Sequence, residues 1–165
     1  MKGTIIKYAE KNIDTDLIIP ARYLNKSDID HLAGHCMEDL DPEFKEKKEK
    51  LNANIMVGGA NFGCGSSREQ APLSIKGAGI DCVIAPTFAR IFFRNAINIG
   101  LPIIEFENID AFSSGDEVKI DFETGQIVNL TTDQKYTIKS MPGFLQEIIQ
   151  SDGLISFARK KIIES

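Results

Sequence analysis

Short apolar runs alternate with helical repeats through the middle of the chain. Residues 55–59 and 81–85 are nearly continuous apolar runs, which is typical of strands buried on both faces. Residues 70–76 and 87–99 carry apolar side chains every three or four positions and predict helices, and 101–106 is a third strand-like run. This order, with short connections, predicts parallel strands joined by right-handed crossovers.

The rest of the chain predicts antiparallel pairing. Residues 117–122 and 126–130 alternate apolar and polar positions on either side of the turn 123–125, which predicts a hairpin. The other expected elements are strands over 4–8 and 136–138, a loop over 11–16, and helices over 142–150 and 154–163. Together these patterns predict an α/β fold with mixed parallel and antiparallel strands.

The segment between the predicted strands 4–8 and 55–59 contains a long polar stretch. Residues 27–38 predict a helix that opens on Ser27 and Asp28, both good N-cap residues. Residues 42–54 are expected to be exposed, and the nearly balanced charge run 43–50 fits either a solvated helix face or a linker.

Length and composition narrow the class of protein. The 165 residues are expected to form one domain over 1–165, and the hydrophobic (42%) and charged (26%) fractions are those of a globular protein. A net charge of −5 argues against a nucleic-acid partner. No apolar run approaches the roughly 18 residues of a membrane span, and no targeting segment is expected. Cys36, Cys64 and Cys82 lack metal or disulfide spacing, so we expect reduced thiols in a cytoplasmic protein.

The stretch GANFGCGSSRE, residues 59–69, lies between a predicted strand and a predicted helix. A glycine-rich turn at a helix start presents backbone N–H groups to an anion. Arg68 adds a planar fork of donors that matches a carboxylate, and Ser66 and Ser67 add hydroxyls. The combination suits a small carboxylic acid or a phosphate, although it matches neither the Walker A nor the GxGxxG pattern.

Two interpretations of this turn stay open on local grounds. Ser66 and Glu69 have the spacing of a capping box, in which the serine only starts a helix. Pro72 favours a later helix start, because proline fits best in a first turn, and this would free Ser66 for chemistry. His31 and His35 have the spacing of a metal pair but lack a third ligand, so we expect surface or half-buried histidines.

Three blocks of sequence carry a resemblance to a known family. They are NFGCGSSRE at 61–69, FARIFFRN at 88–95, and DTD at 14–16 with PARYL at 20–24. Their order and spacing resemble the small subunits of 3-isopropylmalate dehydratases, in the aconitase superfamily. The resemblance extends over essentially the whole chain.

The resemblance implies a fold, a partner and a reaction. The fold is the swivelling β/β/α domain. The partner is a large subunit, in a heterodimer or heterotetramer, which holds a [4Fe–4S] cluster, so that this chain itself holds no metal. The reaction interconverts 2-isopropylmalate and 3-isopropylmalate by dehydration and rehydration in leucine biosynthesis, and this subunit acts only with the large one.

The resemblance also assigns roles to residues. Ser66 would be the catalytic base, while Ser67 and Arg68 would hold a substrate carboxylate. Thr15 and Asp16 would line the same cleft. A loop would select the substrate with Tyr23, Leu24, Asn25 and Lys26. For Arg90 and Arg94, on the predicted helix 87–99, we expect structural ion pairs with Asp or Glu, and a role in the site remains the alternative.

Related functions remain as alternatives. Homoaconitase-type relatives resemble Tyr-Leu-Arg-Thr in the selecting loop, whereas this chain has Asn25 and Lys26 after Leu24. Without that arginine a tricarboxylate is disfavoured, because a buried carboxylate without a partner is costly. The alternatives are the small subunit of a homoaconitase or a 2,3-dimethylmalate dehydratase, or a stand-alone dicarboxylate-binding module.

Overall fold

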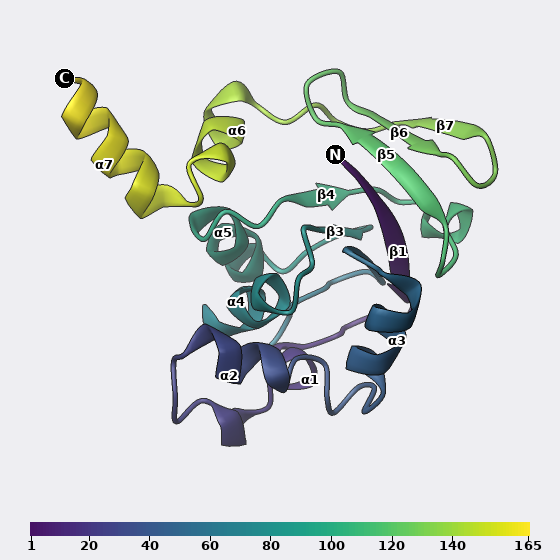
Figure 1. Ribbon diagram of the computed structural model, residues 1–165, viewed down its shortest axis with the longest axis horizontal. Helices are drawn as coiled ribbons and strands as arrows, with labels where there is room; N and C mark the ends of the chain where they lie inside the picture. Colours follow the sequence, from purple (N-terminus) through teal and green to yellow (C-terminus); the bar gives the residue numbers. More distant parts are fainter.

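A seven-stranded mixed sheet runs through the molecule in the order β4-β3-β2-β1-β5-β6-β7 (Figure 1). The structure is a computed structural model that describes residues 1–165. The parallel strands are β1 (Lys2–Tyr8), β2 (Ile55–Gly58), β3 (Cys82–Ala85) and β4 (Ile103–Glu105). The antiparallel strands are β5 (Glu117–Asp121), β6 (Gln126–Asn129) and β7 (Gln134–Thr137), and β5 pairs with β1.

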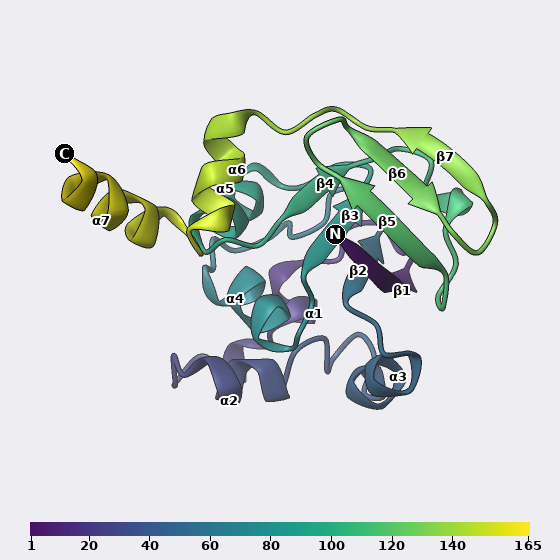
Figure 2. The same cartoon turned by 45° about the horizontal axis from the view of Figure 1, so that its top comes forward.

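Helices cover one face of the parallel strands, and α7 extends away from the body with the C-terminus at its tip (Figure 2). The α-helices are α1 (Thr15–Ile18), α2 (Ile29–Gly34), α3 (Phe44–Leu51), α4 (Gln70–Gly77), α5 (Arg90–Asn98), α6 (Gly143–Gln150) and α7 (Leu154–Glu164). Two single-turn 3-10 helices are η1 (Ala21–Tyr23) and η2 (Ile109–Ala111). None of the helices has the length and apolar character needed to span a bilayer.

Both faces of the parallel strands are buried, which explains their continuous apolar sequence. One row of paired residues packs under the helices: Ile6, Met56, Val83 and Ile103. The alternate row packs against residues of β5 and β6: Ile5, Ile55, Val57, Cys82 and Ile84. The sheet therefore curls until its antiparallel half covers the face opposite the helices. The result is a three-layer β/β/α arrangement, and the predicted mixed α/β fold is confirmed.

Several elements differ in their bounds from the sequence prediction. A short helix, α1, begins inside the predicted loop because Asp14 caps it by accepting the Leu17 N–H at 2.9 Å. The predicted helix over 27–38 ends at Gly34, because Met37 turns to a positive φ of 63° and donates its N–H to the Ile18 carbonyl. Tertiary hydrogen bonds thus override helical periodicity here.

The predicted helix over 87–99 also begins later, at Arg90. Before it, Phe62 donates its N–H to the Thr87 carbonyl, and Ala89 donates its N–H to the Phe62 carbonyl. These bonds hold residues 87–89 extended beside the glycine turn. The charge run 43–50 belongs to helix α3, with Phe44 buried beneath it.

Gly63 offers a test of this packing. Its φ is 81°, and a Cβ there would lie 2.2 Å from the Phe92 ring. We expect Gly63→Ala to lower the free energy of unfolding by at least about 1–3 kcal/mol, since both strain and overpacking oppose it. Urea denaturation measures the change.

Gly34→Ala is the matched control, because nothing lies within 4 Å of the added methyl group. It should be neutral or stabilising by up to about 1 kcal/mol. Equal midpoints for the two variants would contradict this description of Gly63.

Candidate active site

The glycine turn lies where the parallel strands end. Residues after β1 and β2 meet at this edge, as the carboxyl ends of parallel strands do. Gly63 donates its N–H to the Ile13 carbonyl, and Thr15 donates its N–H to the Cys64 carbonyl, both at 2.8 Å. These two hydrogen bonds, the loop clamp, fix the loop after β1 against the turn after β2.

The clamp requires a glycine at position 65. Its φ is 97°, and an added Cβ would lie 3.3 Å from the Thr15 hydroxyl oxygen. Thr15 itself is buried beneath the turn. The absence of a side chain therefore lets the two loops approach closely, and it brings Thr15 and Asp16 beside the serines.

The capping box suggested by Ser66 and Glu69 does not form. Helix α4 begins at Gln70, its N-cap position is Glu69, and no side chain caps it. Pro72 then falls within the first turn, where its missing N–H costs nothing. Ser66 and Ser67 are exposed, and their hydroxyls make no hydrogen bond within the protein.

A run of backbone donors is left free at the same place. The amide N–H groups of residues 65–69 donate to no acceptor in the protein. They precede a helix whose first N–H groups also lack partners and which carries a partial positive charge at this end. Free amides, two hydroxyls and a helix start make this turn a candidate anion site.

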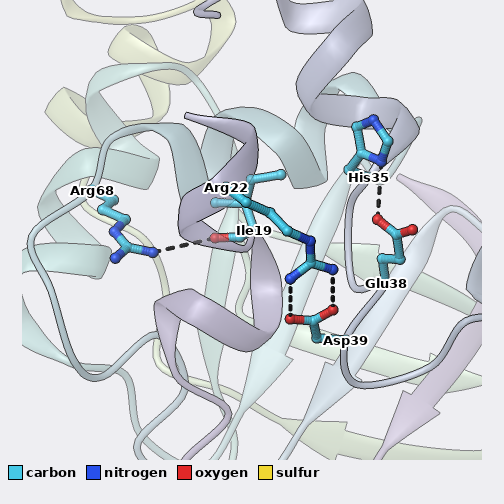
Figure 3. A network of polar contacts seen from close by, with 6 residues as sticks. All are labelled: Ile19, Arg22, His35, Glu38, Asp39 and Arg68. Carbon is cyan, nitrogen blue, oxygen red and sulfur yellow. Dashed lines mark hydrogen bonds and ion pairs between the residues drawn. The ribbon is translucent and has the colours of Figure 1, made fainter. Parts of the chain in front are cut away.

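Arg68 and Asp16 form an ion pair beside the turn. Arg68 Nη1 donates to Asp16 Oδ1 at 2.5 Å. The same nitrogen donates to the Ile19 carbonyl at 3.3 Å (Figure 3). The Arg68 side chain is only 16% exposed, whereas Asp16 is 62% exposed. The remaining guanidinium donors have no protein partner. Arg68 is therefore held in place while keeping donors for a ligand.

The four loop residues of the predicted site follow Ile19 closely. Tyr23 and Leu24 are half-buried, whereas Asn25 and Lys26 are exposed. Neither Asn25 nor Lys26 makes a hydrogen bond or ion pair in the chain. The contact from Arg68 to the Ile19 carbonyl connects this loop to the glycine turn.

The histidines and cysteines do not assemble a metal site. No group of three or more His, Cys, Asp or Glu side chains is placed to hold a metal ion. His31 and His35 are half-buried and contact protein groups instead. The three cysteines are free, and burial raises the pKa of the Cys36 thiol to about 12.

The expected ion pairs of Arg90 and Arg94 are wrong. Both side chains are exposed on α5, and neither lies within salt-bridge distance of a carboxylate. The extended residues 87–89 lie beside Phe62 of the glycine turn, and α5 begins directly after them.

The β/β/α fold and the glycine turn are shared with a known class of domain. The aconitase C-terminal domain family matches residues 1–109, and the chain belongs to that family. Within it the similarity is to 3-isopropylmalate dehydratase small subunits. The one from Clostridium beijerinckii is 57% identical over 98% of this chain and 99% of its own. The one from Ruminiclostridium cellulolyticum is also 57% identical, over 98% of each chain.

A solved structure extends the comparison to three dimensions. The 3-isopropylmalate dehydratase from Methanocaldococcus jannaschii is 42% identical and superposes with a TM-score of 0.90, over 98% of this chain and 95% of that one. The resemblance inferred from the three sequence blocks is therefore confirmed, together with the fold.

Thiol labelling tests the exposure of the turn. Cys64 is partly exposed, with a pKa raised by burial and by the Asp14 charge, while Cys36 and Cys82 are fully buried. We expect a maleimide at pH 8 to label one thiol in the native chain and three after unfolding, counted by mass spectrometry. Cys64→Ser should remove the native label. Comparable native labelling of Cys36 would contradict the burial described here.

Proposed function

We propose that this chain is the small subunit of a 3-isopropylmalate dehydratase and supplies one wall of its active site. The reaction removes water from 2-isopropylmalate and adds it back with the hydroxyl on the neighbouring carbon, giving 3-isopropylmalate. The observation that carries the proposal is the uncapped turn, in which exposed serine hydroxyls and free amides adjoin the half-buried, oriented Arg68.

Ser66 is the proposed base. Its hydroxyl oxygen, as an alkoxide, takes the proton from the carbon next to a carboxylate, while the hydroxyl group on the adjacent carbon departs. A double bond forms between the two carbons, and rehydration returns the proton to the other one. A serine alkoxide needs strong stabilisation. In this proposal the free N–H groups of residues 65–69 and the Arg68 charge supply it, and the proposal is supported by the absence of any protein acceptor for those N–H groups.

Arg68 and Ser67 bind a substrate carboxylate in this proposal. Arg68 is already oriented by Asp16 and Ile19, so little of its rotamer freedom remains to be lost when substrate arrives. A carboxylate would use the donors that Asp16 leaves free, in a bidentate contact. Thr15 shapes the floor of this subsite from beneath the turn.

The loop from Tyr23 to Lys26 is the proposed selector of the substrate. Asn25 and Lys26 are free to meet a ligand, and neither offers an arginine fork for a third carboxylate. A branched, apolar side chain is therefore favoured over a carboxylate arm. Lys26, adjacent to Asn25 in the same loop, is proposed to contact one of the two carboxylates that every candidate substrate carries.

The proposal includes a partner and its cofactor. The small-subunit family implies a large-subunit partner. We assign the [4Fe–4S] cluster to that partner, where Lewis-acid activation of the departing hydroxyl is the chemistry expected of it. All three cysteines are free, which suits the reducing cytoplasm to which we assign the complex.

Ser66→Ala tests the assignment of the base. In the complex reconstituted with the large subunit, we expect kcat for isopropylmalate to fall about 10²- to 10⁴-fold, the usual contribution of a positioned base. Because the Ser66 hydroxyl bonds nothing in the protein, the free energy of unfolding should change by less than about 0.5 kcal/mol.

Ser67→Ala is the matched control at the neighbouring hydroxyl. It should raise KM while leaving most of kcat, because Ser67 is assigned to binding. Near-normal turnover by the Ser66 variant would show that its hydroxyl is not the base.

A comparison of substrates separates the related dehydratases. We expect the reconstituted complex to prefer isopropylmalate or 2,3-dimethylmalate over homoaconitate. Asn25→Arg should shift kcat/KM toward the tricarboxylate by roughly 10-fold or more, since a hydrogen bond to a charged group contributes about 1.5–3 kcal/mol. A wild-type preference for homoaconitate would contradict the proposed substrate.

The exposed, free amides of the turn also favour a second candidate, a stand-alone dicarboxylate-binding module. Calorimetry on the lone chain with malate distinguishes the two. Micromolar affinity that is lost in Arg68→Ala would support the module, whereas a half-site should bind only weakly.

A further inference from the structure

The loop that carries the proposed substrate selectors is held mainly by side chains. Within residues 21–27, the backbone N–H groups of Tyr23 and Leu24 donate only to Pro20 and Ala21, inside the same turn. No backbone hydrogen bond joins this loop to another part of the protein. The placement of Tyr23 to Lys26 must therefore depend on contacts made by side chains.

Two histidines of the α2 region supply such contacts to Tyr23. The His35 ring stacks on the Tyr23 ring with a centroid distance of 3.6 Å and an interplanar angle of 5°. His31 Nε2 donates to the Tyr23 carbonyl at 3.0 Å, since a carbonyl only accepts. The two histidine rings meet edge to face at 5.1 Å. Tyr23 is thus held both by its ring and by its backbone.

The histidines are themselves fixed. His35 Nδ1 donates to the Glu38 carboxylate at 2.9 Å (Figure 3). Arg22 forms a bidentate pair with Asp39, at 2.6 and 2.9 Å, and its guanidinium lies over the Tyr23 ring. Residues 35–39 therefore contact two consecutive residues of the loop, Arg22 and Tyr23.

The contacts of His31 and His35 with Tyr23, here called the histidine anchor, are connected to the glycine turn through packed helices. Helix α2 packs on α4, where Gly77 allows the close approach of Ile29 and Ala33. Helix α4 begins at Gln70, two residues after Arg68 of the turn. The position of the selecting loop is therefore connected to α4, the helix that follows the proposed base, through the two histidines and helix α2.

We propose that His35 and His31 are positioning residues for substrate selection, which hold Tyr23 to Lys26 at a fixed distance from the glycine turn. This inference rests on the proposed function. Neither histidine is assigned contact with substrate, and both act through Tyr23. Loss of the stack leaves the loop free to sample other positions, which weakens substrate binding more than the chemical step.

The kinetic test uses the complex reconstituted with the large subunit. For His35→Ala we expect KM for isopropylmalate to rise about 3- to 10-fold with kcat within about 2-fold, the factor that one aromatic pair supplies. His35→Phe keeps the stack and should restore most of the wild-type KM. His31→Ala should raise KM as well, and His31→Gln, which retains an N–H donor, should partly restore it.

Asp30→Asn is the matched control, because Asp30 is exposed on the same helix as His31 and its side chain makes no hydrogen bond or ion pair. In a Tyr23→Ala background His35→Ala should have no further effect on KM. The inference is overturned if His35→Ala leaves KM unchanged, if it lowers kcat alone, or if His35→Phe fails to rescue.

A readout without turnover separates this inference from the proposed function. The chain has two histidines, so their ring-proton resonances are assigned from the His31→Ala and His35→Ala spectra of the lone subunit. Tyr23→Leu should shift the His35 resonances by removing the ring current of the stacked tyrosine. Unshifted resonances would overturn the anchor. An anchor present in these spectra, with no isopropylmalate turnover by the wild-type complex, would instead count against the proposed function alone.

Discussion

The candidate site depends on the loop clamp, the pair of backbone hydrogen bonds from Gly63 to Ile13 and from Thr15 to Cys64. These bonds form only where two segments of the backbone approach without side chains between them. Gly65 allows that approach with its positive φ. The clamp has a further consequence for the turn. Its backbone is committed to the neighbouring loop on one side, so the following residues enter α4 without a cap. The free amides and hydroxyls are the result of that geometry.

An uncapped helix start is costly in an isolated domain, because unpaired donors are stable only when water or a ligand satisfies them. Here the turn is exposed, so water satisfies it in the free chain, and an anion can replace that water. The Arg68–Asp16 pair has a matching role. Asp16 occupies only part of the guanidinium, so the cation is oriented without being fully neutralised by protein. Both features describe a site that is organised before its ligand arrives but is open on one side.

That open side agrees with a site completed by another chain. The exposed residues on this side include the two serines of the turn, Asn25 and Lys26 of the loop, and the unpaired Arg90 and Arg94. The full-length relatives of the chain are named as small subunits. The histidine anchor fits the same picture. In the proposed function this loop would meet substrate at a subunit boundary. Fixing the loop within its own domain would then reduce the conformational freedom that is lost when substrate binds. The stack on Tyr23 provides this with two side chains rather than with a strand.

The sequence by itself determined the main strands and helices, the hairpin, the mixed pairing and the donor-rich composition of the glycine turn. Each of these follows from local periodicity, turn residues or motif spacing. Pro72 even indicated that Ser66 is not a cap, a local steric rule that the structure bears out. Tertiary structure decided the rest. Only folding places the Ile19 carbonyl and Asp16 on Arg68, ends α2 early, leaves Arg90 without a carboxylate, and stacks His35 on Tyr23. These outcomes depend on contacts between segments distant in the chain, which no local pattern encodes.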